Sequence, residues 1–313
     1  MLGKTAGGVF WMLRYMERTE NTARMIDAGL RISLTRSSAA ESEWTSILTA
    51  SGLLAAYQER RDRIEAQKVI DFLLRDRTNP GSVICAVEAA RTNARMVRTA
   101  LTREVWEAVN ECWLMLKAVL AHRVKQQELP EILGTIRQRS AYVRGSLHGT
   151  MIRNDIYNFA RIGTFLERAD SAARILDVKY YILLPSIIHV GSMSDNVQWE
   201  TILHATSSTR AYQTLHENEF DPRKIAQFLI LDRRLPRSLA FCYDKIADNL
   251  GYLADDYGER LACHQMVEQI CQRFNTTTIN QIFDYGLHEF VTECLADSRA
   301  LGRQIEIDYR FFE

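Results

Sequence analysis

The feature that most constrains the fold of this chain is an internal repeat. Residues 15–27 return as residues 165–177, with Glu, Arg, Ala, Arg and Asp in the same places at an offset of 150 residues. Further matches follow in the same order at offsets of 155 and 156 residues, including Trp44 with Trp199, Tyr57 with Tyr212, and Pro80 with Pro236. Such self-similarity is typical of a duplicated structural unit. We therefore predict two tandem units, residues 1–154 and 155–313.

The spacing of apolar residues predicts helices nearly throughout. Phe10, Leu13, Met16 and Ile26 recur at helical spacing, and no stretch sustains the period-two alternation of a strand. Only 15 glycines and 5 prolines occur in 313 residues, which argues against the many turns of an all-β or α/β fold. The predicted fold class is all-α: two tandem duplicated helical-bundle units packed as one body with pseudo-two-fold symmetry.

Caps and prolines indicate where the helices begin. Helical stretches are expected to start near residues 43, 64, 80, 103 and 130. Thr102, followed by an acidic first turn, has the pattern of an N-cap residue. Pro80 and Pro130 are predicted to be first-turn prolines. The longest breaks between helices are expected at residues 33–42 and 184–196.

Charge and cysteine content exclude several classes of function. The 39 Lys and Arg residues balance 39 Asp and Glu residues, so no global attraction to nucleic acid or to an acidic membrane is expected. The longest uncharged run, residues 180–194, is too short to span a bilayer. None of the six cysteines forms a C-x-x-C pair, so free buried thiols are expected. We expect a cytoplasmic protein.

The repeated Glu-Arg helices carry the one chemical signal in the sequence. Spacings of three and four residues place their polar side chains on one helix face in each unit. If the two helices meet near a two-fold axis, Glu17 should pair with an arginine of the second unit and Glu167 with an arginine of the first. The candidate network or cleft comprises Arg14, Glu17, Arg18, Arg24, Asp27, Glu167, Arg168, Asp170, Arg174 and Asp177.

Three interpretations of these charged helices stay open. In the first, the ion pairs fix helix register and have no further role, as buried Glu-Arg networks often do. In the second, the side chains line a polar cleft for an anionic or amino-acid-like group, because the planar guanidinium binds carboxylate or phosphate through two parallel bonds. In the third, the face is solvated and without consequence.

A second candidate is a basic stripe with spacings of four and three residues, formed by Arg91, Arg95 and Arg98. The second unit has Ala247 and Gly251 in place of the first two arginines, so the stripe is not repeated. A solvated face or a docking patch for an acidic partner is therefore favoured over a catalytic site.

No cofactor or metal site is predicted. A di-iron bundle needs Glu-x-x-His pairs, and no histidine of this chain has a glutamate three residues before it. The segment Gly3-Lys4-Thr5 lacks the upstream glycine and the strand of a phosphate-binding loop. The Gly-x-Ser-x-Gly motif of a nucleophile elbow is absent as well.

Residues 10–24 resemble the Glu-Arg motif of the alpha-E family, a domain of unknown function that is usually present as a tandem duplication. Residues 165–180 resemble its second copy, so the resemblance spans nearly the whole chain. Two departures occur. Leu13 stands where a glycine is expected, although Gly163 occupies the corresponding place in the second unit, and Thr164 replaces the arginine found at position 14. A strictly symmetric site is therefore not expected.

The resemblance also implies a functional setting. Alpha-E proteins are encoded beside, or fused to, circularly permuted ATP-grasp ligases, and transglutaminase-like proteins and N-terminal-nucleophile peptidases accompany them. This implies an accessory or docking subunit of an ATP-dependent peptide synthesis or modification system, whose ATP-grasp partner supplies the nucleotide and Mg²⁺ sites. The alternative is an enzyme in its own right that uses the Glu/Arg-lined cleft for amide or peptide chemistry.

Overall fold

The structure is a computed structural model that describes residues 2–35, 40–61, 63–183, 193–216 and 220–312. Over these ranges the chain forms fifteen α-helices and one short 3-10 helix, and it forms no strand. The predicted all-α class is thus confirmed. Parts of the two expected long breaks, residues 36–39 and 184–192, lie outside the described residues.

The first half begins with a long N-terminal helix. Its helices are α1 (Gly3–Thr35), α2 (Ala40–Ala50), α3 (Leu54–Gln58), α4 (Ala66–Leu74), α5 (Val83–Met96), the 3-10 helix η1 (Arg98–Ala100), α6 (Arg103–Val119) and α7 (Leu129–Thr150).

The second half begins with another long helix. Its helices are α8 (Asp155–Leu183), α9 (Met193–Ala205), α10 (Thr209–Leu215), α11 (Pro222–Leu231), α12 (Leu239–Tyr257), α13 (Ala262–Thr276), α14 (Ile279–Tyr285) and α15 (Leu287–Asp308).

Local capping chemistry accounts for several helix starts. The Thr102 side chain accepts a hydrogen bond from the Val105 amide at the start of α6, as its sequence pattern predicts. Pro130 lies in the first turn of α7. The prediction for Pro80 is wrong: this residue lies in the turn before α5, whose cap is Ser82. The serine hydroxyl can accept from the first free amides of the helix, so the helix begins there and not at the proline.

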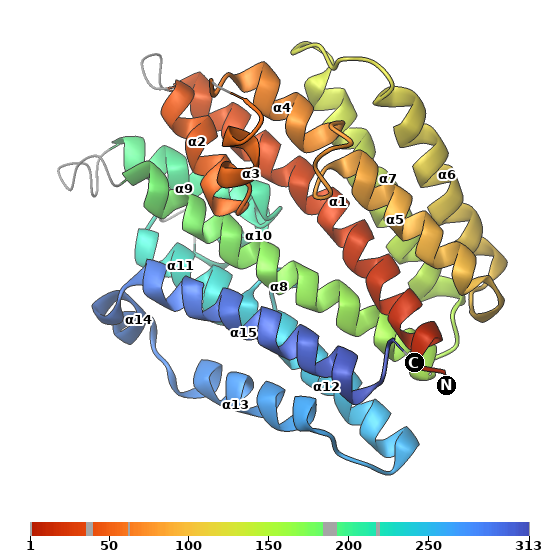
Figure 1. The fold of residues 1–313 in the computed structure, drawn as a ribbon. Helices are drawn as coiled ribbons and strands as arrows, with labels where there is room; N and C mark the ends of the chain where they lie inside the picture. Colours follow the sequence, from red (N-terminus) through yellow and green to blue (C-terminus); the bar gives the residue numbers. More distant parts are fainter. Residues whose placement is uncertain (1, 36–39, 62, 184–192, 217–219, 313) are drawn as a thin grey trace.

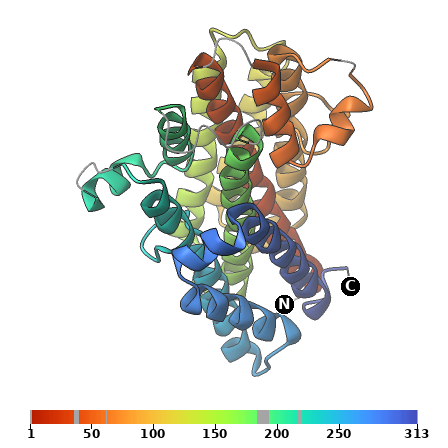
Figure 2. The ribbon, with the colours of Figure 1, turned by 90° about the vertical axis from the view of Figure 1, so that its left-hand side faces the viewer.

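The long helices α1 and α8 lie side by side at the centre of the molecule and run in the same direction (Figures 1 and 2). Helices α5 and α7 pack on α1, and α12 and α15 pack on α8. The next helix of each half crosses over: α2 packs on α8, and α9 packs on α1. Because of this exchange the two halves interleave, and polar residues of α1 and α8 are held against each other.

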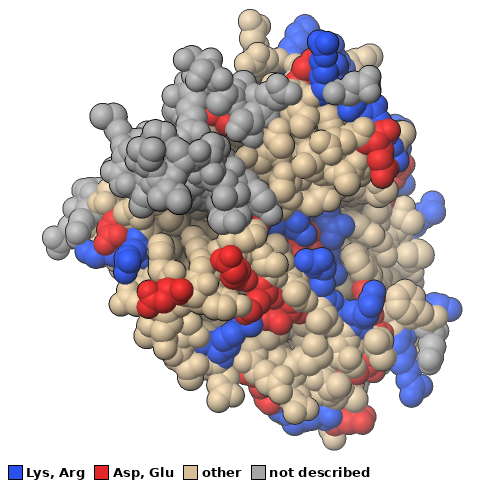
Figure 3. Space-filling model, turned by 60° about the vertical axis from the view of Figure 1, so that its left-hand side comes forward, with Lys and Arg blue, Asp and Glu red and all other residues tan. Residues whose placement is uncertain are grey.

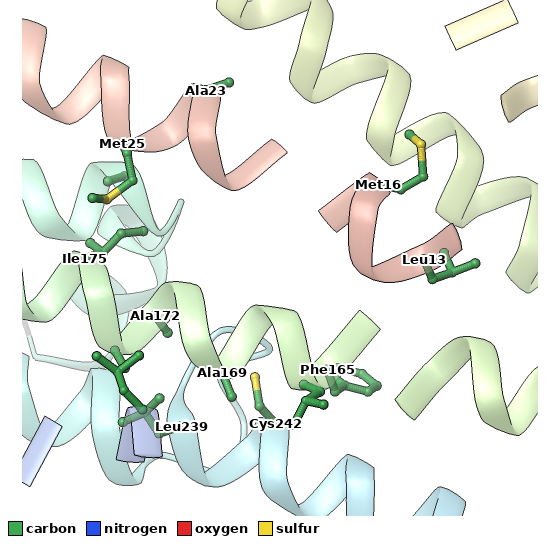
Figure 4. Close-up of a cluster of buried hydrophobic side chains, with 14 of the residues drawn as sticks. Leu13, Met16, Ala23, Met25, Phe165, Ala169, Ala172, Ile175, Leu239 and Cys242 are labelled. Atoms are coloured by element: carbon green, nitrogen blue, oxygen red, sulfur yellow. The ribbon is translucent and has the colours of Figure 1, made fainter. Parts of the chain in front are cut away.

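The apolar faces of α1 and α8 contribute to one continuous core (Figure 4). Met16 and Met25 of α1, Phe165 and Ile175 of α8, and Leu239 of α12 are all buried. Burying one large apolar side chain stabilises the fold by about 1.5–3 kcal/mol. The charged residues of the two central helices are therefore embedded in helices that the core holds firmly in place.

Gly163 allows α8 to approach α1 closely. A Cβ atom at this position would lie 2.3 Å from the carbonyl oxygen of Phe10, which is far inside van der Waals contact. At the matching place in α1, Leu13 is buried in the core, so the close approach requires a glycine in one helix only. This contact brings the Glu-Arg segments that follow, four or more residues further along each helix, within hydrogen-bonding distance.

The six cysteines are free, and four of them are buried. Burial raises the pKa of both Cys112 and Cys242 to about 12, so these thiols stay protonated and unreactive at neutral pH. No helix in the described part of the chain is long and apolar enough to cross a membrane.

Candidate functional site: two Glu-Arg clusters between the central helices

The first cluster is centred on two carboxylates of α1. Glu17 and Glu20 are each only 1% exposed, although each carries a charge. Burying a carboxylate is costly unless charged or hydrogen-bonding partners surround it. Four arginines do so here, and we call the group the closed cluster: Glu17, Glu20, Arg24, Arg144, Arg168 and Arg237.

Glu17 is bound by arginines from three different elements. Arg168 of α8 donates through Nε and Nη2 to the two carboxylate oxygens, at 2.9 and 3.1 Å. Arg237, in the turn before α12, donates to Oε1 at 3.2 Å, and Arg144 of α7 donates to Oε2 at 3.1 Å. The forked pair with Arg168 is the geometry in which guanidinium and carboxylate interact most strongly.

Glu20 shares two of these arginines and adds one from its own helix. Arg24 donates through Nε and Nη2 to Oε1, at 2.9 and 2.6 Å. Arg237 donates to the same oxygen at 2.5 Å, and Arg144 donates to Oε2. Arg237 also reaches the side-chain oxygen of Asn21 at 3.4 Å. The closed cluster therefore joins α1, α7, α8 and the turn before α12.

The electrostatics of the closed cluster keep its carboxylates ionised. Burial alone would raise the pKa of Glu17, but the attraction of Arg168, Arg237 and Arg144 outweighs it and holds this pKa well below its usual range. Burial and the neighbouring Glu17 would likewise raise the pKa of Glu20, and the arginines again lower it. Burial lowers the pKa of Arg237 to about 10, which still leaves its guanidinium charged at neutral pH.

The second cluster is centred on the two carboxylates of α8. We call it the open cluster: Arg14, Arg18, Glu167, Asp170, Arg174 and Arg299. Arg18 donates through Nε and Nη2 to the two oxygens of Glu167, at 2.6 and 2.9 Å, and Arg14 donates to Oε2 at 2.9 Å. Arg174 donates to Asp170 at 2.6 Å. Glu167 is thus bound by the first helix in the same way that Glu17 is bound by Arg168.

Glu167 is also held in its ionised form. Burial would raise its pKa, but the attraction of Arg18 and Arg14, together with their hydrogen bonds, lowers the pKa to about 2. A carboxylate with this pKa carries almost no proton at neutral pH and accepts one reluctantly. It is therefore a poor general acid or base.

Arg24 and Arg174 perform the same task on opposite sides of the central pair. Arg24 donates to the carbonyl oxygen of Ala205, the last residue of α9, and Arg174 donates to that of Ala50, the last residue of α2, both at 2.9 Å. The last carbonyls of a helix lack intrahelical partners and carry partial negative charge, so a guanidinium there is favourable. Each arginine thereby fixes the helix that crosses over from the other half.

The clusters differ in their packing. A pocket of about 360 Å³ opens beside the second one and is lined by its six charged residues, Arg14, Arg18, Glu167, Asp170, Arg174 and Arg299. The rest of the lining consists of apolar side chains, Gly81 and the uncharged polar residues Asn21, Thr22, Ser51 and Ser171. Small-molecule sites in proteins have volumes of roughly 300–1,000 Å³.

Two residues predicted for the network lie outside both clusters. Asp27 is near Arg31 and Arg137, at 3.4 and 3.3 Å, one turn beyond Arg24. Asp177 accepts a hydrogen bond from Nδ1 of His288 at 2.6 Å, and burial raises its pKa. The other eight predicted residues all belong to one cluster or the other.

Four residues of the clusters were absent from the predicted set: Glu20, Arg144, Arg237 and Arg299. Glu20 lies on the first Glu-Arg helix itself, whereas each of the three arginines comes from an element remote in sequence from the Glu-Arg helices. A signal was present, because Arg144 and Arg299 stand at the repeat offset of 155 residues, and Arg237 lies between Pro236 and Ser238, which match Pro80 and Ser82.

The predicted basic stripe is wrong in part. Helix α5 ends at Met96, so Arg98 belongs to η1 and lies over the Trp106 ring at 5.2 Å. Arg91 donates to Asn110 at 2.8 Å and lies over the Trp113 ring at 4.5 Å. Arg95 is exposed. On the molecular face drawn in Figure 3, basic and acidic side chains are interspersed among larger uncharged areas.

Among the described residues, no group of three or more His, Cys, Asp or Glu side chains is arranged to hold a metal ion.

Comparison with known proteins identifies a family and three relatives. The Alpha-E family model, described as a predicted alpha-helical domain with a conserved ER motif, matches residues 1–310. The relatives are uncharacterised proteins of Mycobacterium bovis and of two strains of Mycobacterium tuberculosis, each 24% identical over 322 residues. Each match covers 95% of this chain but 35% of the relative, so the chain spans about a third of the length of these proteins. No solved structure is significantly similar to the chain.

Proposed function

The chain belongs to the Alpha-E family, and from this membership we propose that it is an accessory or docking subunit of an ATP-grasp-linked peptide synthesis or modification system. The partner is a circularly permuted ATP-grasp protein, and a transglutaminase-like protein is a further candidate. With a net charge of zero, neither nucleic acid nor a membrane is proposed as a partner.

One observation carries this proposal: in the three relatives the matched region is about a third of a longer protein. Fusion keeps two parts of a chain at a high effective concentration, which is advantageous when they act together. The matched region is therefore expected to act together with the rest of those proteins, and we propose that this chain acts with an equivalent partner.

We also propose that the chain is a tandem duplication of units 1–154 and 155–313 with pseudo-two-fold symmetry. Equivalent helices make equivalent contacts: α5 and α7 pack on α1 as α12 and α15 pack on α8, and α2 and α9 cross over in the same manner. The matching roles of Arg24 and Arg174 at the ends of α9 and α2 support the same proposal.

The state of the central carboxylates favours an accessory role over catalysis by the Glu-Arg motif. Glu17 and Glu167 are ionised and fully engaged with arginines, so neither is suited to move protons in a reaction. The alternative, an enzyme that uses the Glu/Arg-lined cleft for amide or peptide chemistry, has one observation in its favour. Glu167 and Asp170 line an accessible pocket.

Charge reversal in the basic stripe of Arg91, Arg95 and Arg98, the proposed docking face, tests the accessory role. Arg95→Glu changes an exposed residue and should slow binding to the purified ATP-grasp partner about tenfold at low salt, with a smaller effect as salt rises. Arg260→Glu is the matched control, because Arg260 is an exposed arginine of the other half. Equal binding of both variants and the wild type would remove Arg95 from the interface, and failure of the wild type to bind would overturn the docking role.

The enzyme alternative is tested on the same complex. Glu167→Gln keeps the shape of the side chain and removes its charge, and the docking proposal expects assembly and turnover to be retained. If this variant assembles normally but the complex loses turnover, the Glu/Arg-lined cleft is catalytic and the alternative replaces the proposal.

A further inference from the structure

Two short turns of similar sequence differ in the residue that they direct toward the central helices. The turn before α12 reads Pro236-Arg237-Ser238, and the turn before α5 reads Pro80-Gly81-Ser82. Arg237 is nearly buried and donates to Glu17, Glu20 and Asn21 of the closed cluster. Gly81 has no side chain and lines the pocket of the open cluster. The space that an arginine fills on one side is left accessible on the other.

The charge lining this pocket is unbalanced. Four arginines face two carboxylates, which leaves an excess of two positive charges. Arg14 and Arg18 bind Glu167, and Arg174 binds Asp170. The fourth arginine, Arg299, donates from Nε to the carbonyl oxygen of Leu295 at 3.2 Å and pairs with no carboxylate in the described part of the chain. Its terminal nitrogens are therefore available to an anion.

Four apolar residues also line the pocket, and they come from α1, α2, α4 and the segment between α2 and α3. They are Met25, Ile47, Leu53 and Leu73, of which Leu53 is the most exposed. An inorganic oxyanion would use the arginines and leave the apolar surface in water. A ligand that carries a carboxylate on a compact apolar body would use both, and burial of its apolar part would contribute to affinity.

We propose that this pocket binds an organic carboxylate with an apolar side chain, of the size of an amino acid or of the end of a short peptide. Arg299 binds the carboxylate together with the free nitrogens of Arg14 and Arg18, and Met25 and Leu53 contact the apolar part. The site lies entirely within this chain, so the proposal goes beyond the docking role and does not depend on a partner.

Calorimetry on the isolated full chain tests the proposal with three probes. N-acetylleucine carries a carboxylate and an apolar side chain, and its amide has the same shape without the charge. Inorganic phosphate is an oxyanion without an apolar body. We expect N-acetylleucine to bind at least about tenfold more tightly than either of the other two, because a charge-assisted hydrogen bond and apolar contact both contribute.

Two variants locate the binding site. Arg299→Gln should weaken N-acetylleucine binding about tenfold, whereas Arg303→Gln, which changes an exposed arginine one turn further along α15, should leave binding unchanged. A second pair of variants tests whether the pocket itself is the binding site. Gly81→Arg should abolish binding, because an arginine side chain at this position would occupy the pocket, just as Arg237 occupies the corresponding place in the closed cluster. Its Cβ would lie 3.2 Å from Oδ1 of Asn79, so a small shift of that side chain is needed. Gly149→Arg, at a position with open space around it, is the matched control.

The outcomes separate clearly. Binding of N-acetylleucine that is lost in Arg299→Gln and kept in Arg303→Gln supports the proposal, provided that thermal unfolding shows both variants to be folded. If Gly81→Arg proves unstable, the Arg299 pair still decides the result. No binding to the wild type, equal binding of acid and amide, tighter binding of phosphate, or equal affinity in both α15 variants overturns it. None of these results depends on whether the ATP-grasp partner binds.

Discussion

The closed and open clusters contain the same kind of Glu-Arg pair between the central helices but differ in their exposure to solvent. In each, a glutamate of one central helix accepts a forked pair of hydrogen bonds from an arginine of the other: Arg168 with Glu17, and Arg18 with Glu167. Arg237 then seals the first cluster against solvent. At the second, Gly81 supplies no side chain, and Arg18 stays 32% exposed where Arg168 is 11% exposed.

This difference shows that one arrangement of helices can give a shielded ion cluster on one side and a pocket on the other. The closed cluster uses both its carboxylates to hold α1, α7, α8 and the turn before α12 together. The open cluster keeps the pair with Glu167 but adds Arg14 from α1, where the matching residue of α8 is Thr164. The extra arginine helps to hold Glu167 without filling the pocket. The closed cluster thus ties the helices together, while the open cluster keeps an accessible pocket.

The largest expected effect separates the two central glutamates. Glu17→Ala removes the carboxylate that Arg168, Arg237 and Arg144 share in a buried site. Because uncompensated positive charge is then left in the core, the free energy of unfolding should fall by about 3–5 kcal/mol. Glu167→Ala should cost about 2 kcal/mol, since Arg18 and Arg14 can be hydrated through the pocket. Urea denaturation measures both.

A surface control sets the baseline for this pair of variants. Glu107→Ala removes an exposed partner of Arg103 and should change stability by less than about 0.5 kcal/mol. If Glu17→Ala and Glu167→Ala proved equally destabilising, the clusters would not differ in solvent access as the structure indicates.

Acid should weaken both clusters through their carboxylates. The pKa of Glu167 is lowered from 4.5 to about 2, so its stabilising contribution is complete above pH 4.5 and is lost as the pH falls toward 2. The free energy of unfolding, measured by urea denaturation, should therefore decrease as the pH is lowered from about 5 to about 2.5.

The variant Glu167→Gln shows how much of the pH dependence of the unfolding free energy comes from this residue. Its side chain does not titrate, so its unfolding free energy should depend less steeply on pH over the same interval, while the share due to Glu17 and Glu20 remains. Identical slopes for the variant and the wild type would contradict the ionised state assigned to Glu167.

A smaller effect is expected when the closed cluster is opened. Arg237→Gly removes three hydrogen-bond contacts with Glu17, Glu20 and Asn21, and should cost about 2 kcal/mol, because Arg168, Arg144 and Arg24 still bind the carboxylates. Hydrogen exchange should show faster opening of the amides near Glu17. Unchanged stability and exchange would mean that Arg237 does not seal this cluster.

The smallest effect is expected at the open cluster. Arg299 is exposed and pairs with no carboxylate among the described residues, so Arg299→Gln should change the unfolding free energy by less than about 0.5 kcal/mol. A thermal scan beside Arg303→Gln measures this change. A loss comparable to that of Arg237→Gly would show that Arg299 is structural and not reserved for a ligand.

Much of the candidate site follows from patterns within single segments. Helical periodicity puts Glu17, Arg18 and Arg24 on neighbouring turns of one helix, and the same pattern recurs at Glu167, Arg168 and Arg174. These spacings are local and depend only on backbone geometry. They therefore identified the charged helices. The pairing of each glutamate with arginines of the other half was predicted from the repeat, on the assumption that the two helices meet near a two-fold axis.

The sequence by itself determined the all-helical class, the cap at Thr102 and most members of the two clusters. Only the tertiary structure decided that Arg144 and Arg237 complete the closed cluster, that Asp27 and Asp177 belong to neither, and that Gly81 leaves a pocket. The physical reason is distance along the chain. Arg237 meets Glu17 across 220 residues, and whether a missing side chain leaves a cavity depends on what the remaining helices pack into that space.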